Sequence, residues 1–182
     1  GIDNNPYLNE LYDNILHNYA LSLFGITSKE LKPVDIADAL QFADVLSKST
    51  DEDNSERHKI WAQEIVALLK AMYPDNPAVL DYFGTVLLST ENYLGLSKNA
   101  PGFYGRTLLD RFYTEFNMEF LSIPAEKGNH FFRSQKIVYD RLTEPYFSYS
   151  GPTSMGKSYI MRMFIKKQVM DGSKLNFAII VP

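Results

Sequence analysis

The stretch Ser150-Gly151-Pro152-Thr153-Ser154-Met155-Gly156-Lys157-Ser158 fits the pattern G-x-x-x-x-G-K-[S/T]. This spacing is typical of a phosphate-binding loop, or P-loop. Glycine has no Cβ, so Gly151 and Gly156 can adopt the positive φ angles that let successive backbone N–H groups surround an anion. The sequence therefore predicts a nucleotide-binding loop over residues 151–158, including Thr153, Ser154 and Met155.

The helix expected after the loop adds to its attraction for phosphate. The N-terminal end of a helix carries a partial positive charge, so a helix that begins near Lys157 directs this charge at the phosphates. We expect the Lys157 ammonium to reach the β- and γ-phosphates and the Ser158 hydroxyl to take one position around Mg²⁺. ATP and Mg²⁺ are therefore the expected ligands. The alternative is an ordinary glycine-rich turn before a helix.

The segments that flank the loop have the pattern of an α/β unit. Residues 146–149 (YFSY) have the pattern of a strand, residues 159–169 (YIMRMFIKKQV) that of a helix with one apolar face, and residues 175–181 (LNFAIIV) that of a second, buried strand. This order predicts an incomplete α/β P-loop segment with two parallel strands joined by a crossover helix.

Composition sets limits on the class of protein. The chain has 182 residues, of which 45% are hydrophobic, so it can bury a substantial core. It has no cysteine, which excludes disulfides and cysteine-based zinc sites. No apolar run is long enough to span a bilayer, and the first residues (GIDNNPYLNE) do not resemble a signal peptide. We expect no membrane partner and a cytoplasmic location.

Charge is distributed unevenly along the chain. Residues 1–125 contain 9 Lys and Arg against 18 Asp and Glu, whereas residues 126–182 contain 9 against 4. The basic part is the part with the phosphate loop, which suits polyanions such as nucleotide and nucleic acid. Solvated helix faces would give the same count.

Most of the sequence before residue 126 has helical periodicity. Asn5-Pro6 and Asn76-Pro77 are typical helix starts, because Asn caps the first turn and Pro suits the first helical position. Apolar spacing predicts helices over residues 6–23, 33–46, 55–72, 77–88 and 106–120, followed by a loop at 127–129 and a helix over about 132–142. The fold class expected is mainly α, with an N-terminal helical bundle.

The helix predicted over residues 106–120 carries a stripe of large apolar side chains: Leu108, Leu109, Phe112, Tyr113, Phe116 and Phe120. At helical spacing we predict that this stripe, like the single Trp61, belongs to the core. Stacking of the stripe on nucleic-acid bases is the alternative.

Two weaker patterns lie in the helical part. The separations of Ala62, Pro74 and Gly84 match part of a tetratricopeptide-like repeat, although a plain helical bundle explains them as well. The three histidines His17, His58 and His130 have no ligand spacing to one another, so we expect no metal or nucleophilic site on them.

Gln135 lies on the predicted helix before the loop, 22 positions ahead of Lys157. Its amide offers both a donor and an acceptor to an adenine edge, and a neighbouring aromatic or guanidinium plane could cover the face of the base.

With Gln135, the loop 151–158 and the run Ala178-Ile179-Ile180-Val181-Pro182 in this order, residues 127–182 resemble the start of superfamily-two helicases with DEAD/DEAH-type cores. The resemblance implies a Gln motif that recognises adenine, a RecA-like motor domain, ATP hydrolysis, and nucleic acid as the substrate. It covers less than a third of the chain.

The sequence departs from that family in three ways. Ser158 stands where Thr is more common, residues 146–149 are polar for a central parallel strand, and no Asp-Glu-type Walker B pair follows the loop. Hydrolysis requires a group that organises Mg²⁺ and the attacking water. We therefore expect residues 1–125 to be a helical accessory domain and residues 126–182 the start of the motor of a longer helicase-like ATPase, without hydrolysis by this chain alone.

Two alternatives stay open. The loop could belong to a P-loop ATPase of another class, or residues 1–125 could be a protein-interaction module with its own partner. An unpaired strand at residues 175–181 also predicts a strand-mediated homodimer, because open sheet edges pair with other chains.

Overall fold

The computed structural model describes residues 2–26, 30–151 and 156–178. The chain divides into two compact units, residues 1–106 and 107–182. The division falls after Arg106, whereas the sequence suggested a domain boundary after residue 125, so the helix over residues 108–121 belongs to the second unit. The roles assigned to the two domains remain predictions.

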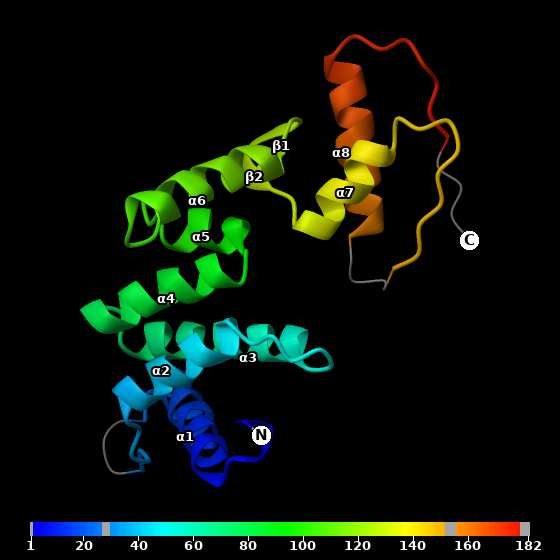
Figure 1. Cartoon of the computed structure of the whole chain (residues 1–182). Coiled ribbons are helices and arrows are strands. Elements are labelled where there is room, and N and C mark those ends of the chain that lie inside the picture. Colours follow the sequence, from blue (N-terminus) through cyan, green and yellow to red (C-terminus); the bar gives the residue numbers. More distant parts are fainter. Residues whose placement is uncertain (1, 27–29, 152–155, 179–182) are drawn as a thin grey trace. The chain divides into compact units, whose positions relative to one another are not determined.

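The first unit is helical throughout its described elements, which follow one another from blue to green in Figure 1. They are η1 (Ile2–Asn4), α1 (Pro6–Leu23), α2 (Ile36–Ser47), α3 (Ser55–Met72), α4 (Pro77–Ser89) and α5 (Tyr93–Asn99). Helices α1 to α4 correspond to those predicted at residues 6–23, 33–46, 55–72 and 77–88, whereas α5 was not predicted.

Side-chain caps explain where the helices begin. The Asn5 carboxamide accepts hydrogen bonds from the N–H groups of Tyr7 and Leu8, and Asn76 does the same at the start of α4. Pro6 and Pro77 occupy the first helical positions, where a missing N–H costs nothing. These two helix starts are confirmed.

Two buried asparagines on α1 bind the backbone of the segment that leads to α2. Asn14 Nδ2 donates to the Pro33 carbonyl at 3.1 Å, and Asn18 Nδ2 donates to the Lys32 carbonyl at 2.9 Å. Asn18 Oδ1 also accepts from the Lys32 N–H at 2.9 Å. The two asparagines thus hold the connection between α1 and α2 through its main-chain atoms.

Trp61 and His58 anchor α3. Trp61 is half-buried rather than a full core residue, and the rings of Tyr12 and Phe42 meet it edge-on at centroid distances of 5.3 and 4.9 Å. His58 is buried. Its Nε2 lies 3.1 Å from the Asp3 carboxylate, and its Nδ1 lies 2.6 Å from Ser49 Oγ.

Phe103 covers the middle of α4. Gly84 is buried there, and a Cβ added to it would lie 2.7 Å from the Phe103 ring. Helix α3 packs against α2 and α4, and α2 also contacts α4. The tetratricopeptide-like reading of these helix pairs remains a prediction.

The second unit combines three helices with a hairpin. Its elements are α6 (Leu108–Leu121), β1 (Ser122–Ile123), β2 (Glu126–His130), α7 (Arg133–Arg141) and α8 (Lys157–Met170). The two strands pair antiparallel. Its core contains Ile123, Ala125, Phe131 and Met163, with Tyr139 and Tyr159 packed against them.

The sheet differs from the one expected. Residues 146–149 and 175–178 are not strands, and residues 179–181 lie outside the described part of the chain. The loop predicted at residues 127–129 lies inside β2. The mainly helical class is confirmed, whereas the pair of parallel strands is not found in the described residues. Strands need partners, and neither segment has one there.

The prediction for the stripe on α6 is wrong. All six of its side chains are exposed, with exposed fractions from 41% (Phe120) to 84% (Leu108), whereas Thr114 and Asn117 on the helix are buried. Periodicity identifies which residues share a face, but it does not say which face is covered.

Among the described helices, none is long and apolar enough to cross a membrane.

Candidate nucleotide-binding site

The candidate site is built around the start of α8. Gly156 has φ 70° and ψ 34°, a left-handed conformation that disfavours side chains, and the helix begins with the next residue, Lys157. The first hydrogen bond of the helix runs from the Ile160 N–H to the Gly156 carbonyl at 3.0 Å. The N–H groups of the first turn have no acceptor within the helix, and a glycine has no side chain to cap them. Such a helix start can bind an anion.

Gln135 lies beside this glycine. It is the third residue of α7, where its Oε1 accepts a hydrogen bond from the Phe132 N–H at 3.0 Å. Its Nε2 would lie 3.1 Å from a Cβ built on Gly156. The structure therefore brings together the glutamine and the loop glycine that the sequence analysis selected from separate segments.

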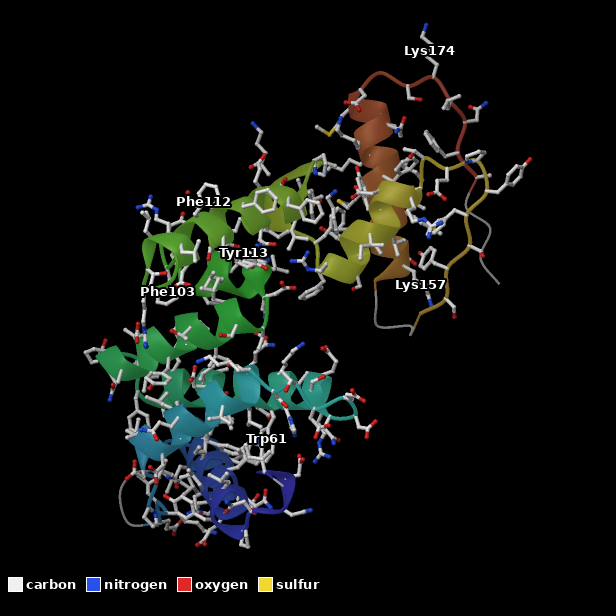
Figure 2. All side chains as sticks on the ribbon, viewed as in Figure 1. Trp61, Phe103, Phe112, Tyr113, Lys157 and Lys174 are labelled. Carbon is white, nitrogen blue, oxygen red and sulfur yellow. The ribbon has the colours of Figure 1, made fainter. Side chains whose placement is uncertain are left out.

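The Lys157 side chain connects the start of α8 to Gly151. Its Nζ donates a hydrogen bond to the carbonyl of Gly151 at 2.5 Å, so its ammonium group lies by the first residue of the loop (Figure 2). Lys157 is half-buried, and Ser158 is exposed in the first turn of α8. The ammonium is thus positioned by a carbonyl dipole that an anion could replace as its partner.

Five of the eight predicted site residues are described: Gly151, Gly156, Lys157, Ser158 and Gln135. The other three, Thr153, Ser154 and Met155, lie outside the described residues. Among the described residues, no group of three or more His, Asp or Glu could hold a metal ion. A Mg²⁺ ion here would rely on the Ser158 hydroxyl and on phosphate oxygens.

Glu126 fixes α8 to the hairpin, and the sequence analysis did not identify it. Its carboxylate accepts hydrogen bonds from Lys166 Nζ at 3.1 Å, from Asn129 Nδ2 at 3.0 Å and from the Tyr159 hydroxyl at 3.1 Å. These donors, Lys166 first, hold the pKa of Glu126 below its usual value. A single Glu in a polar segment gives no local signal of such a role.

An aromatic cluster lies in the segment between α7 and the loop. The Arg141 guanidinium lies 4.6 Å from the Phe147 ring centroid, and the rings of Phe147 and Tyr149 stack at 5.5 Å. Glu144 holds the guanidinium, with its Oε1 3.0 Å from Arg141 Nε. Phe147 and Tyr149, in the segment predicted to be a strand, thus form a short stack with the Arg141 guanidinium.

Gly151 and Gly156 therefore flank the candidate loop, and Lys157, the first residue of α8, reaches the Gly151 carbonyl with its ammonium group. Comparison of the chain with known protein families, curated proteins and solved structures found no match.

Proposed function

We propose that this chain binds ATP through residues 151–158, as the phosphate-binding part of a helicase-like ATPase that acts on nucleic acid. The observation that carries the proposal is the juxtaposition of the left-handed Gly156, the Lys157 that starts α8, and the Gln135 amide against that glycine. In this proposal the start of α8 with Lys157 contacts the phosphates of ATP, and Gln135 contacts its base.

The loop residues supply the phosphate contacts. The first-turn N–H groups of α8 and the Lys157 ammonium would bind the β- and γ-phosphates, because both present positive charge at the loop. Bound ATP brings Mg²⁺ with it, and the Ser158 hydroxyl is the side chain available to this ion in the first turn. The ammonium would exchange the Gly151 carbonyl for a phosphate oxygen.

Gln135 supplies the candidate contact to the base. Its Oε1 already accepts from the Phe132 N–H, which fixes the orientation of the amide and leaves its Nε2 on the side of Gly156. An oriented amide can favour adenine over guanine, because the two bases present opposite donor and acceptor patterns. The parallel strands expected at residues 146–149 and 175–181 belong to this proposal as elements that would form beside further strands of a RecA-like sheet.

The test is a titration of Mg²⁺·ATP into the full chain, with Lys157→Ala and the matched control Lys174→Ala. Lys174 is an exposed lysine beyond the C-terminal end of α8 (Figure 2). A charged hydrogen bond contributes about 1.5–3 kcal/mol, so Lys157→Ala should weaken binding by roughly 10- to 100-fold while Lys174→Ala leaves it unchanged. Equal affinities for all three proteins, or no saturable binding, would contradict the proposal.

A second titration separates the helicase-like reading from other P-loop ATPases. We expect the chain to prefer ATP over GTP and Gln135→Ala to lose this preference while it retains phosphate binding. Equal binding of ATP and GTP that does not depend on Gln135 would assign the loop to a P-loop ATPase of another class.

A further inference from the structure

Helix α6 presents its large apolar side chains to solvent. Leu108, Leu109, Phe112, Tyr113, Phe116 and Phe120, together called the α6 face, have exposed fractions of 41 to 84%. Their spacing places them on one side of the helix, and Figure 2 labels Phe112 and Tyr113 on it. The Phe116 and Phe120 rings are nearly parallel, with centroids 6.4 Å apart.

The side of α6 that is buried carries polar groups with partners. Thr114 Oγ1 donates to the Asp110 carbonyl at 2.7 Å, and Asn117 Nδ2 donates to the Tyr113 carbonyl at 2.8 Å. Arg133 Nη2 donates to Asn117 Oδ1 at 2.9 Å, which ties α6 to α7. The buried side of α6 thus combines two polar residues with the buried Leu121, while the α6 face is exposed.

The helix also begins with a complete local cap. The Thr107 hydroxyl accepts from the Asp110 N–H, and the Asp110 carboxylate accepts from the Thr107 N–H, both at 3.0 Å. This reciprocal cap stabilises the first turn without any help from the α6 face. The face is thus a preformed surface.

We propose that the α6 face is the surface through which two copies of this chain associate, with their α6 helices packed antiparallel. The six side chains expose on the order of 800 Å² per chain, which matches the area that each partner contributes to a standard protein interface. Monomeric proteins rarely expose contiguous apolar patches of this size.

A second copy fits this surface because an apolar stripe is complementary to itself. A two-fold contact places the same patch on both sides, so each Phe112 can pack near Phe116 and Phe120 of the second copy. Arg111, whose Nε donates to Glu115 Oε1 at 2.9 Å, and Glu119 lie eight residues apart on the same side of the stripe. An antiparallel arrangement therefore brings each Arg111 near the Glu119 of the other copy. Nucleic acid fits poorly, because α6 carries three acidic residues against one Arg.

The experiment is sedimentation equilibrium of the full chain over concentrations up to roughly 100 µM, a hundredfold above a micromolar dissociation constant. We compare the unaltered chain with Phe112→Ser/Phe116→Ser and with the control Ile137→Ser, which alters a 56% exposed side chain on α7. All three positions are exposed, so the variants should fold, and circular dichroism checks this. We expect a dimer whose dissociation constant rises at least tenfold in the double variant only.

A charge exchange tests the antiparallel arrangement. Arg111→Glu, which also removes the exposed ion pair with Glu115, and Glu119→Arg should each weaken the dimer, and the two together should restore it. A double exchange that fails to restore association would overturn the antiparallel arrangement. A monomer at all concentrations would overturn the proposal. So would a dimer that survives Phe112→Ser/Phe116→Ser and is lost in Leu175→Pro, because that result would assign association to the predicted strand at residues 175–181.

Discussion

The side-chain amide of Gln135 lies against Gly156, with its Nε2 3.1 Å from the position that a Cβ on this glycine would take, which is closer than an ordinary contact. Gly156 is therefore constrained twice, once by its positive φ and once by its neighbour. The contact thus links the glycine before α8 to the first turn of α7.

Gly156→Ala should lower the free energy of unfolding by about 1–2 kcal/mol from the left-handed backbone alone, and by more because of the contact with Gln135. Gly172→Ala is the matched control, because Gly172 also has a positive φ (79°) but no atom within 4 Å of an added Cβ. Urea unfolding of both variants measures the difference. An equal loss at the two positions would mean that the glutamine does not restrict Gly156.

Glu126→Gln should lower stability at neutral pH, with an effect that disappears in acid. The bonds from Lys166, Asn129 and Tyr159 lower the pKa of Glu126 in the folded chain. Its contribution is therefore complete above the pKa of the unfolded chain, about 4.3, and is lost as the pH falls through the lower folded value. Urea unfolding of both proteins between neutral pH and acid measures this. A gap between the two proteins that persists in acid would contradict it.

Asp3→Ala should destabilise the first unit by about 1–3 kcal/mol, because it leaves the buried His58 Nε2 without its carboxylate acceptor. Asp53→Ala, which removes an exposed carboxylate from the turn before α3, should change stability by less than about 0.5 kcal/mol. Thermal unfolding of the two variants provides the comparison. Similar losses would show that the contact between Asp3 and His58 contributes little.

The effect of Gly84→Ala on the free energy of unfolding should change sign when Phe103 is replaced by Ala. In the unaltered chain the new methyl group would meet the Phe103 ring at 2.7 Å, and such overpacking costs about 1–3 kcal/mol. In a Phe103→Ala background the clash is gone, and the substitution should stabilise α4 by up to about 1 kcal/mol through helix propensity. A double-mutant cycle by urea unfolding measures both values. Two destabilising effects of equal size would refute the packing explanation.

Helix starts could be predicted from the sequence because their causes are local. Asn5 and Asn76 each bond to N–H groups two and three residues ahead, so a short window contains both partners. The same holds for the candidate site at Gly156 and Lys157, where the turn and the helix start are adjacent in the chain.

Features that depend on distant partners could not be predicted in this way. The α6 face has the spacing of a core, but the chain as described does not cover it. Residues 146–149 have the composition of a strand, but they have no paired segment among the described residues, and the Phe147 and Tyr149 rings stack on each other. Glu126 fixes α8 to the hairpin through hydrogen bonds from Tyr159 and Lys166, which lie more than thirty residues away in sequence.

The hairpin was missed for a related reason. β2 reads EKGNH, which has none of the β-branched or aromatic residues typical of strands. The Phe131 N–H bonds to the Leu121 carbonyl at 2.8 Å, and Phe131 and Ile123 are buried together in the core beside the strand. The flanking residues therefore stabilise a strand that its own composition disfavours.

The asparagines of α1 have an evolutionary consequence. Asn14 and Asn18 recognise the main-chain atoms of Lys32 and Pro33, which are present whatever side chains stand there. Substitutions at residue 32 should accumulate freely among descendants of this chain, whereas insertions or deletions that shift the register of the connection should be eliminated. Selection would then act on the length of the connection and on the two asparagines, and leave the identity of residue 32 to drift.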